Sequence, residues 1–231
     1  MGRLRVIAID GPAGAGKSTI ARRLARALDL EYLDTGARYR AVTADALHRG
    51  WDVHDESAIG PMSREIDIEV GLESVVADGI DVTDFIRGPE VTGAVSTVAA
   101  MSSVRQEMRE RQRHWGETRG GGVIEGRDIG TVVFPDAILK VFLTASPRVR
   151  AERRVAEMGG DVQAIEQSIR ERDFKDSSRS DSPLAESNDA VTVDTSDRSI
   201  DDVVEGIMAL LVERETARGI RGDADHGGSD D

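Results

Sequence analysis

One uninterrupted run near the amino end constrains the fold of this chain more than any other feature. The apolar residues 6–9 stop at Asp10, and the following residues, GPAGAGKS, match the pattern G-x-x-x-x-G-K-[ST] in full. An amphipathic stretch at residues 17–30 comes next, with its apolar side chains on one helical face. A strand, a glycine-rich loop and a helix in this order predict the phosphate-binding unit of an α/β fold.

Residues 11–16 form the glycine-rich loop, which we call the phosphate loop. Its glycines let consecutive backbone N–H groups turn toward one anion, and the following helix adds the positive end of its dipole. Lys17 reaches the β and γ phosphates of a nucleoside triphosphate, and the Ser18 hydroxyl holds Mg²⁺ in loops of this type. The alternative, a glycine-rich turn with a chance lysine, is disfavoured by the strand and helix on either side. The predicted nucleotide-binding residues are Gly11, Pro12, Ala13, Gly14, Ala15, Gly16, Lys17, Ser18 and Thr19.

Composition narrows the class of protein. The 231 residues carry a formal net charge of −13, which argues against a nucleic acid polymer as partner, because duplex binding needs a broad basic surface. Arginines gather at residues 105–113 and 148–179, a pattern that suits small anions. The chain has no cysteine and no apolar stretch near the ~20 residues that span a bilayer. With its first strand at the amino end and no evident apolar interface, we expect a cytoplasmic monomer without a membrane anchor.

The hydrophobic pattern alternates between short and long periods along most of the chain. Short β-rich runs lie at residues 4–9, 31–33, 122–125, 138–144 and 190–194. Amphipathic stretches lie at residues 17–30, 102–118, 146–158, 161–175 and 199–216. Such alternation predicts an α/β fold with a five-stranded parallel sheet flanked by helices on both faces.

Two segments depart from this alternation. Residues 64–87 combine the alternating run EIDIEV with an Asp78-Gly79 turn, which predicts a small inserted antiparallel sheet. An irregular surface excursion is the alternative there. Residues 217–231 are rich in Gly and Asp and contain one apolar residue larger than alanine, so we expect a disordered acidic tail.

Three further motifs join the phosphate loop in a recognisable set. They are DTGARYR at residues 34–40, EGRDIGT at 125–131 and RDFKDSSR at 172–179. Together they resemble the bacterial-type cytidylate kinases, which are P-loop nucleoside monophosphate kinases, over about residues 4–214. The resemblance implies transfer of the γ-phosphoryl group of ATP to CMP or dCMP, directly and in line, with Mg²⁺. It also implies a core at residues 1–34, 94–145 and 183–216, a monophosphate-binding region at 35–93 with the small sheet, and a helical lid at 146–182.

The resemblance also implies roles for individual residues. The implied catalytic residues are Lys17, Arg127, Arg172 and Arg179. The acceptor is bound by Thr35, Tyr39, Arg40, Ser96, Arg105, Arg127, Asp128, Arg172, Asp176 and Arg179. Arg40 and Arg127 would hold the acceptor phosphate with parallel hydrogen bonds. Ser18 and, through water, Glu125 would serve Mg²⁺, although relatives often have the shorter Asp at position 125.

Recognition of cytosine can be argued from its chemistry. Cytosine has an N4 amino donor where uracil has a carbonyl, so a carboxylate that accepts from N4 separates the two bases. The resemblance gives this role to Asp128, beside Ser96 and Arg105, and places Asp176 at the ribose, where it also admits the 2′-deoxy substrate. The alternative is that Asp128 caps a helix or pairs with Arg127.

Other functions remain open from the sequence alone. Another P-loop kinase for a small metabolite, or a kinase that prefers UMP, would share the phosphate loop. A nucleotide-binding module without transfer activity would need no arginines for a second phosphate. A GTP switch is disfavoured, since its N-K-x-D motif is absent and Asn188 is the only asparagine.

Overall fold

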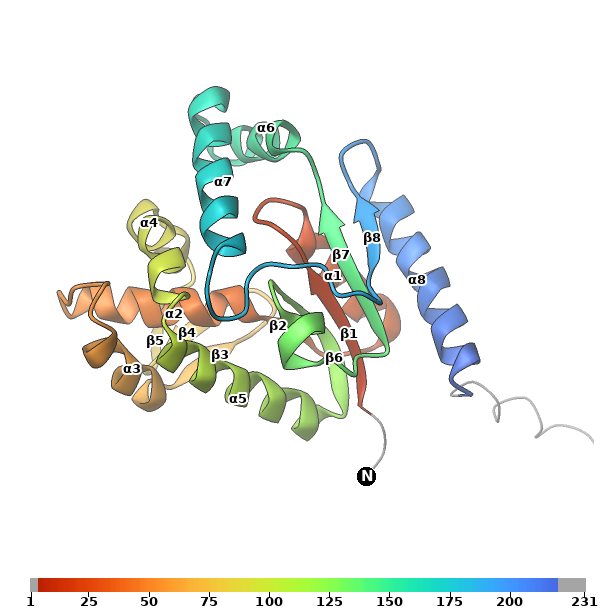
Figure 1. Ribbon diagram of the computed structural model, residues 1–231, viewed down its shortest axis with the longest axis horizontal. Coiled ribbons are helices and arrows are strands. Elements are labelled where there is room, and N and C mark those ends of the chain that lie inside the picture. Colours follow the sequence, from red (N-terminus) through yellow and green to blue (C-terminus); the bar gives the residue numbers. More distant parts are fainter. Residues whose placement is uncertain (1–3, 220–231) are drawn as a thin grey trace, which may run out of the picture.

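The computed structural model describes residues 4–219 and centres on one parallel sheet (Figure 1). The strand order is β2-β6-β1-β7-β8, and all four neighbouring pairs are parallel. The strands are β1 (Arg5–Asp10), β2 (Tyr32–Asp34), β6 (Gly121–Gly126), β7 (Leu139–Thr144) and β8 (Val191–Asp194). The predicted five-stranded parallel sheet is confirmed.

Helices cover both faces of the sheet because its central strand is apolar on both sides. Ile7 and Ile9 pack against α1 (Lys17–Leu28) and α8 (Ile200–Ala217). The alternate residues of β1, starting with Val6, pack against α5 (Ser102–Arg119) on the other face. Side chains of a strand point alternately to opposite faces, so an unbroken apolar run buries both.

The predicted helices are present with small shifts at their ends. The lid region contains α6 (Pro147–Met158) and α7 (Val162–Ser177), which stand at the carboxyl end of β7 (Figure 1). Helix α1 stops at Leu28 rather than at residue 30, because Asp29 adopts the left-handed conformation that ends helices.

The small antiparallel sheet is confirmed between residues 64 and 87. It consists of β3 (Ile68–Val70), β4 (Val75–Ala77) and β5 (Ile80–Asp81). Asp78 and Gly79 both have positive φ angles, of 48° and 77°, as a tight hairpin turn requires. The sheet packs into a second apolar core that extends as far as Met108, and the domain boundaries given above remain a prediction.

Residues 49–101 also contain helices that the hydrophobic pattern did not predict. They are α3 (Glu56–Glu65), the short η1 (Phe85–Arg87) and α4 (Pro89–Val98), which follow α2 (Thr35–His48). Gly60 and Pro61 interrupt the periodicity of α3. A side chain at Gly60 would lie 2.5 Å from Ser103 Oγ, so this glycine permits α3 to pack closely on α5.

The described part of the chain ends at residue 219, just after α8. The predicted disordered tail at residues 217–231 lies outside the described residues beyond residue 219. Within residues 4–219, no helix combines the length and the apolar character needed to cross a bilayer.

Candidate functional site

The phosphate loop has the backbone conformation that an anion cradle needs. Gly11 has a φ of 144°, and a side chain there would lie 2.0 Å from the Leu143 carbonyl oxygen. Gly16, the N-cap of α1, is left-handed, and no side chain caps this helix end. The first N–H groups of α1 are therefore available to a phosphate.

Lys17 is folded back into the loop and buried. Its Nζ donates to the Pro12 carbonyl oxygen at 2.8 Å. Burial, and then the charge of Arg127, lower the pKa of Lys17 to about 7. The ammonium therefore lies in a site where an added anion would stabilise its charge.

Glu125 ends β6 beside the phosphate loop. Its carboxylate accepts a hydrogen bond from the Tyr32 hydroxyl, while the Thr35 hydroxyl donates to its backbone carbonyl at 2.6 Å. Burial, and then the charge of Asp34, raise the pKa of Glu125 to about 7, although a hydrogen bond with the Ser18 side chain acts in the opposite direction. Ser18 and Glu125, the two predicted Mg²⁺ residues, are thus neighbours.

Cations from three other segments gather next to Lys17. Arg40 lies on α2, Arg127 directly follows β6, and Arg172 lies on α7. Burial is the largest cause that lowers the pKa of Arg40 and of Arg172 to about 10, and the charge of Arg127 acts in the same direction on both. The charge of Asp34 opposes the shift of Arg40. Repulsion among cationic side chains in a partly buried cluster is typical of an anion-binding site without its ligand.

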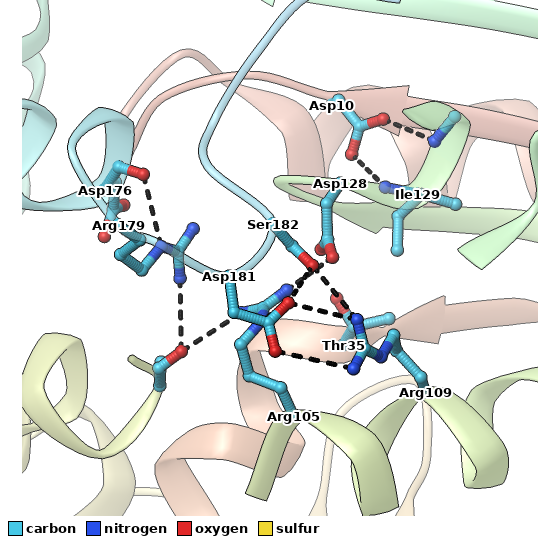
Figure 2. Close-up of polar contacts among 12 residues, drawn as sticks. Asp10, Thr35, Arg105, Arg109, Asp128, Ile129, Asp176, Arg179, Asp181 and Ser182 are labelled. Atoms are coloured by element: carbon cyan, nitrogen blue, oxygen red, sulfur yellow. Dashed lines mark hydrogen bonds and ion pairs between the residues drawn. The ribbon is translucent and has the colours of Figure 1, made fainter. Parts of the chain in front are cut away.

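Two of the predicted acceptor residues are held in ion pairs. Asp176, which is 4% exposed, accepts from Arg127 Nε at 3.0 Å. Its backbone carbonyl accepts from Arg179 Nε at 3.2 Å, as Figure 2 shows. Burial alone would raise the pKa of Asp176, but the charges of Arg127, Arg172 and Arg179 hold it below its ordinary value.

Arg105 and Asp128 form a buried pair near the same place. Arg105 Nη2 donates to Asp128 Oδ2 (Figure 2). The Arg105 guanidinium also lies 5.7 Å from the centre of the Tyr39 ring. The Asp128 side chain caps no helix and does not pair with Arg127, so both alternatives given above for this residue are wrong. Among residues 4–219, its Oδ1 accepts no hydrogen bond, which leaves that oxygen for a ligand.

Ser96 lies at the edge of this group. It lines a cavity of about 290 Å³ together with Arg179. One turn along α4, the Ala99 carbonyl accepts from Arg105 Nη1 at 3.1 Å and from Arg179 Nη1 at 3.4 Å. The structure therefore brings the predicted acceptor residues together from α2, α4, α5, the segment after β6 and α7.

The sequence analysis missed residues that hold this arrangement in place. Asp181 lies 3.7 Å from Arg105 Nε and 3.1 Å from Arg109 Nη1 (Figure 2). Arg150, which is 3% exposed, donates to the Ala13 carbonyl and to Asp173 Oδ1, both at 3.0 Å, and so ties the phosphate loop to α7. A larger cavity of about 520 Å³ opens where these elements meet. Only the local density of arginines marked these positions in the sequence.

The described residues contain no group of three or more His, Cys, Asp or Glu side chains arranged to hold a metal ion. Mg²⁺ in phosphoryl-transfer sites is held by one or two protein groups together with phosphates and water. The adjacent Ser18 hydroxyl and Glu125 carboxylate fit that smaller requirement.

Comparisons with known proteins agree with this geometry. The family model for cytidylate kinase matches residues 7–213. The cytidylate kinase of Streptomyces avermitilis is 45% identical over 219 residues, covering 92% of this chain and 95% of that protein. That of Geobacillus kaustophilus is 48% identical over 218 residues, covering 90% and 96%.

Among solved structures, an uncharacterized protein from Eubacterium ventriosum shares the fold. Its TM-score is 0.53 at 12% identity, over 90% of this chain and 98% of that one. The family match spans nearly all the described residues and confirms the resemblance seen in the motifs. The chain belongs to the cytidylate kinase family.

Proposed function

We propose that this protein transfers the γ-phosphoryl group of ATP to CMP or dCMP, giving ADP and CDP or dCDP. The observation that carries the proposal is the cluster of Lys17, Arg40, Arg127 and Arg172, which unites a donor loop with arginines for a second phosphate. A nucleotide-binding module without transfer activity has no need of that second set. The 45–48% identity to cytidylate kinases also disfavours a kinase for an unrelated metabolite.

The donor side consists of the phosphate loop, Lys17 and Ser18. Backbone N–H groups of the loop and of the amino end of α1 bind the β phosphate, and Lys17 follows the γ-phosphoryl group as it moves. Ser18 and, through water, Glu125 would hold Mg²⁺, which would neutralise part of the phosphate charge. Tyr32 keeps the Glu125 carboxylate in place through its hydrogen bond.

The acceptor side consists of Arg40, Arg105, Arg127, Asp128, Arg172 and Asp176. The attacking oxygen belongs to a monophosphate that is already anionic, so the transfer needs no general base. Its requirements are in-line placement and cancellation of repulsion between two anions. Arg40, Arg127 and Arg172 come from three separate segments and supply both.

Cytosine is recognised by the buried pair of Arg105 and Asp128. The free Oδ1 of Asp128 accepts from the N4 amino group, and uracil would present its O4 acceptor to the same oxygen. Asp176 accepts from the ribose, which leaves the 2′ position without a required contact and admits dCMP. The substrate adds its contacts to ion pairs that exist in the free protein. Asp128 therefore stays paired with Arg105, and Asp176 stays paired with Arg127.

Closure of the lid region would complete the site. Helix α7 carries Arg172, and Arg179 follows it, so movement of this helix toward the phosphate loop brings positive charge over both phosphates. Exclusion of water then prevents hydrolysis of ATP. Among the described residues, the exposed large apolar side chains come from several different elements, and we propose a monomer that acts in the cytoplasm.

The decisive test follows both products of one reaction. Purified protein with ATP, Mg²⁺ and CMP should form CDP and ADP in equal amounts, as measured by ion-exchange chromatography. Formation of ADP without CDP would identify an ATPase, and the absence of both products from folded protein would reject the proposal.

A further inference from the structure

The buried carboxylate of Asp10 joins the strand that leads into the phosphate loop to the turn that follows Asp128. Asp10 is the last residue of β1 and is 5% exposed. Its Oδ1 accepts from the Ile129 N–H at 2.8 Å, and its Oδ2 accepts from the Gly130 N–H at 2.7 Å (Figure 2). Both oxygens are therefore engaged by backbone groups 119 and 120 residues away in the chain.

These two N–H groups open a short helix with an unusual geometry. The segment η2 (Ile129–Val133) is a π-helical turn, closed by the Val133 N–H on the Asp128 carbonyl at 3.1 Å. Asp128 occupies its N-cap position, where an aspartate normally accepts from the first free N–H groups. Here the Asp128 side chain makes no such bond and points toward Arg105 (Figure 2).

We infer that Asp10 is a positioning residue for base recognition, which caps η2 in place of Asp128 and so keeps the Asp128 carboxylate on Arg105. The inference rests on the proposed function, because it concerns how that function distinguishes cytosine from uracil. Without Asp10, the free N–H groups of Ile129 and Gly130 would draw the Asp128 carboxylate back onto its own helix end.

Gly130 is closely packed between Lys140 and Asp10. A Cβ on Gly130 would lie 3.1 Å from Lys140 Cδ and 3.4 Å from Asp10 Oδ2. The contact also requires a carboxylate, because only a carboxylate offers one acceptor oxygen to each of the two N–H groups. An asparagine would accept one of them and turn an amide donor toward the other.

The test is Asp10→Asn, assayed with CMP and with UMP at saturating ATP and Mg²⁺. We expect the ratio of kcat/KM for CMP to that for UMP to fall about 10-fold, the effect of one good polar base contact. The KM for ATP should change less than about twofold. Asp55→Asn is the matched control, because Asp55 also accepts from two backbone N–H groups, at the remote amino end of α3. It should leave the ratio unchanged.

A second comparison shows whether Asp10 acts through Asp128. In an Asp128→Ala background the further change Asp10→Asn should leave the CMP to UMP ratio where Asp128→Ala put it. An equal loss with both acceptors, or a further fall of the ratio in the double variant, would overturn the positioning role and leave the function standing. Wild-type protein that fails to phosphorylate CMP would instead overturn the function and the inference with it.

Gly130→Ala provides a second test of the inference in case Asp10→Asn does not fold. Gly130→Ala crowds the same contact from the opposite side, since the added methyl would lie 3.1 Å from Lys140 Cδ and at van der Waals distance, 3.4 Å, from Asp10 Oδ2. If Asp10→Asn is recovered unfolded, Gly130→Ala should show the selective loss with CMP. A ratio equal to that of the wild type in folded Gly130→Ala would contradict the inference.

Discussion

The donor side and the acceptor side differ in what holds their charges before substrates arrive. On the donor side, backbone geometry dominates: glycines with positive φ expose N–H groups, and Lys17 rests on a carbonyl of its own loop. On the acceptor side, charged side chains hold one another, with Arg105 on Asp128 and Arg127 on Asp176. A short contiguous sequence can build the first arrangement, whereas the second needs segments that only the fold brings together.

This difference has an energetic consequence. The arginines with carboxylate partners are neutralised in the free protein. The pKa of Arg172 is instead lowered by burial and then by the charges of Arg127 and Arg40, which outweigh those of Asp176 and Asp173, and its Nε has no hydrogen-bond partner among the described residues. Lys17 and Arg172 should therefore serve the reaction at the expense of stability, while Arg105 and Arg127 serve both.

Lys17→Ala should produce the largest effect. Removal of the charge that follows the transferring phosphoryl group should lower kcat about 10³-fold. ATP should still bind through the backbone N–H groups, as isothermal titration would measure. A kcat close to that of the wild type would contradict the role assigned to Lys17.

Arg172→Met should lower turnover about 10²-fold and yet stabilise the free protein. The loss of one cation from the cluster relieves repulsion, and the melting temperature should rise by about 2–4 °C in calorimetry for roughly 1 kcal/mol. Arg170→Met is the control, because Arg170 lies on the same helix but pairs with Glu166 on the surface. A lower melting temperature for Arg172→Met would show that this cation is neutralised after all.

Asp128→Ala should have a smaller and more selective effect. The preference for CMP over UMP should fall about 10-fold, because one polar base contact is lost. Steady-state kinetics with both acceptors would measure it, with the exposed Asp136→Ala as control. An unchanged preference would mean that another group reads the base.

The smallest effect concerns the pH dependence of stability. Burial, partly offset by the two backbone hydrogen bonds, raises the pKa of Asp10 from 3.8 to about 6. The folded protein thus holds this proton more tightly than the unfolded chain. The stabilisation that Asp10 provides is complete below about pH 3.8 and is lost as pH rises through 6. Urea unfolding would give the free energy of unfolding of the wild type and of Asp10→Asn at each pH. As the pH rises across that window, the value for the wild type should fall relative to that of Asp10→Asn by on the order of 3 kcal/mol. A constant difference would contradict the direction of the shift.

The contrast between the two sides also explains what the sequence could predict. The phosphate loop, the parallel sheet and the hairpin at Asp78-Gly79 follow from local rules of spacing and turn chemistry. The candidate acceptor residues came from motifs, but their partners did not. Arg105 and Asp128 are separated by 23 residues, and Arg150 and Asp173 by the same number, with no local pattern to join them.

Tertiary packing explains the remaining structural features that the sequence did not predict. The α3 helix contains Pro61 and is held by its contact with α5 rather than by its own periodicity. The π-helical turn after Asp128 is capped from β1, by a residue that reads in the sequence only as the end of a strand. Such long-range caps leave no local signature.

A crystal structure of the protein with CMP and ADP would locate the cytosine and its phosphate directly. We predict the cytosine N4 amino group about 3 Å from an Asp128 carboxylate oxygen, with the monophosphate among Arg40, Arg127 and Arg172. A cytosine ring bound away from Arg105 and Asp128, with the monophosphate outside that arginine cluster, would contradict the account.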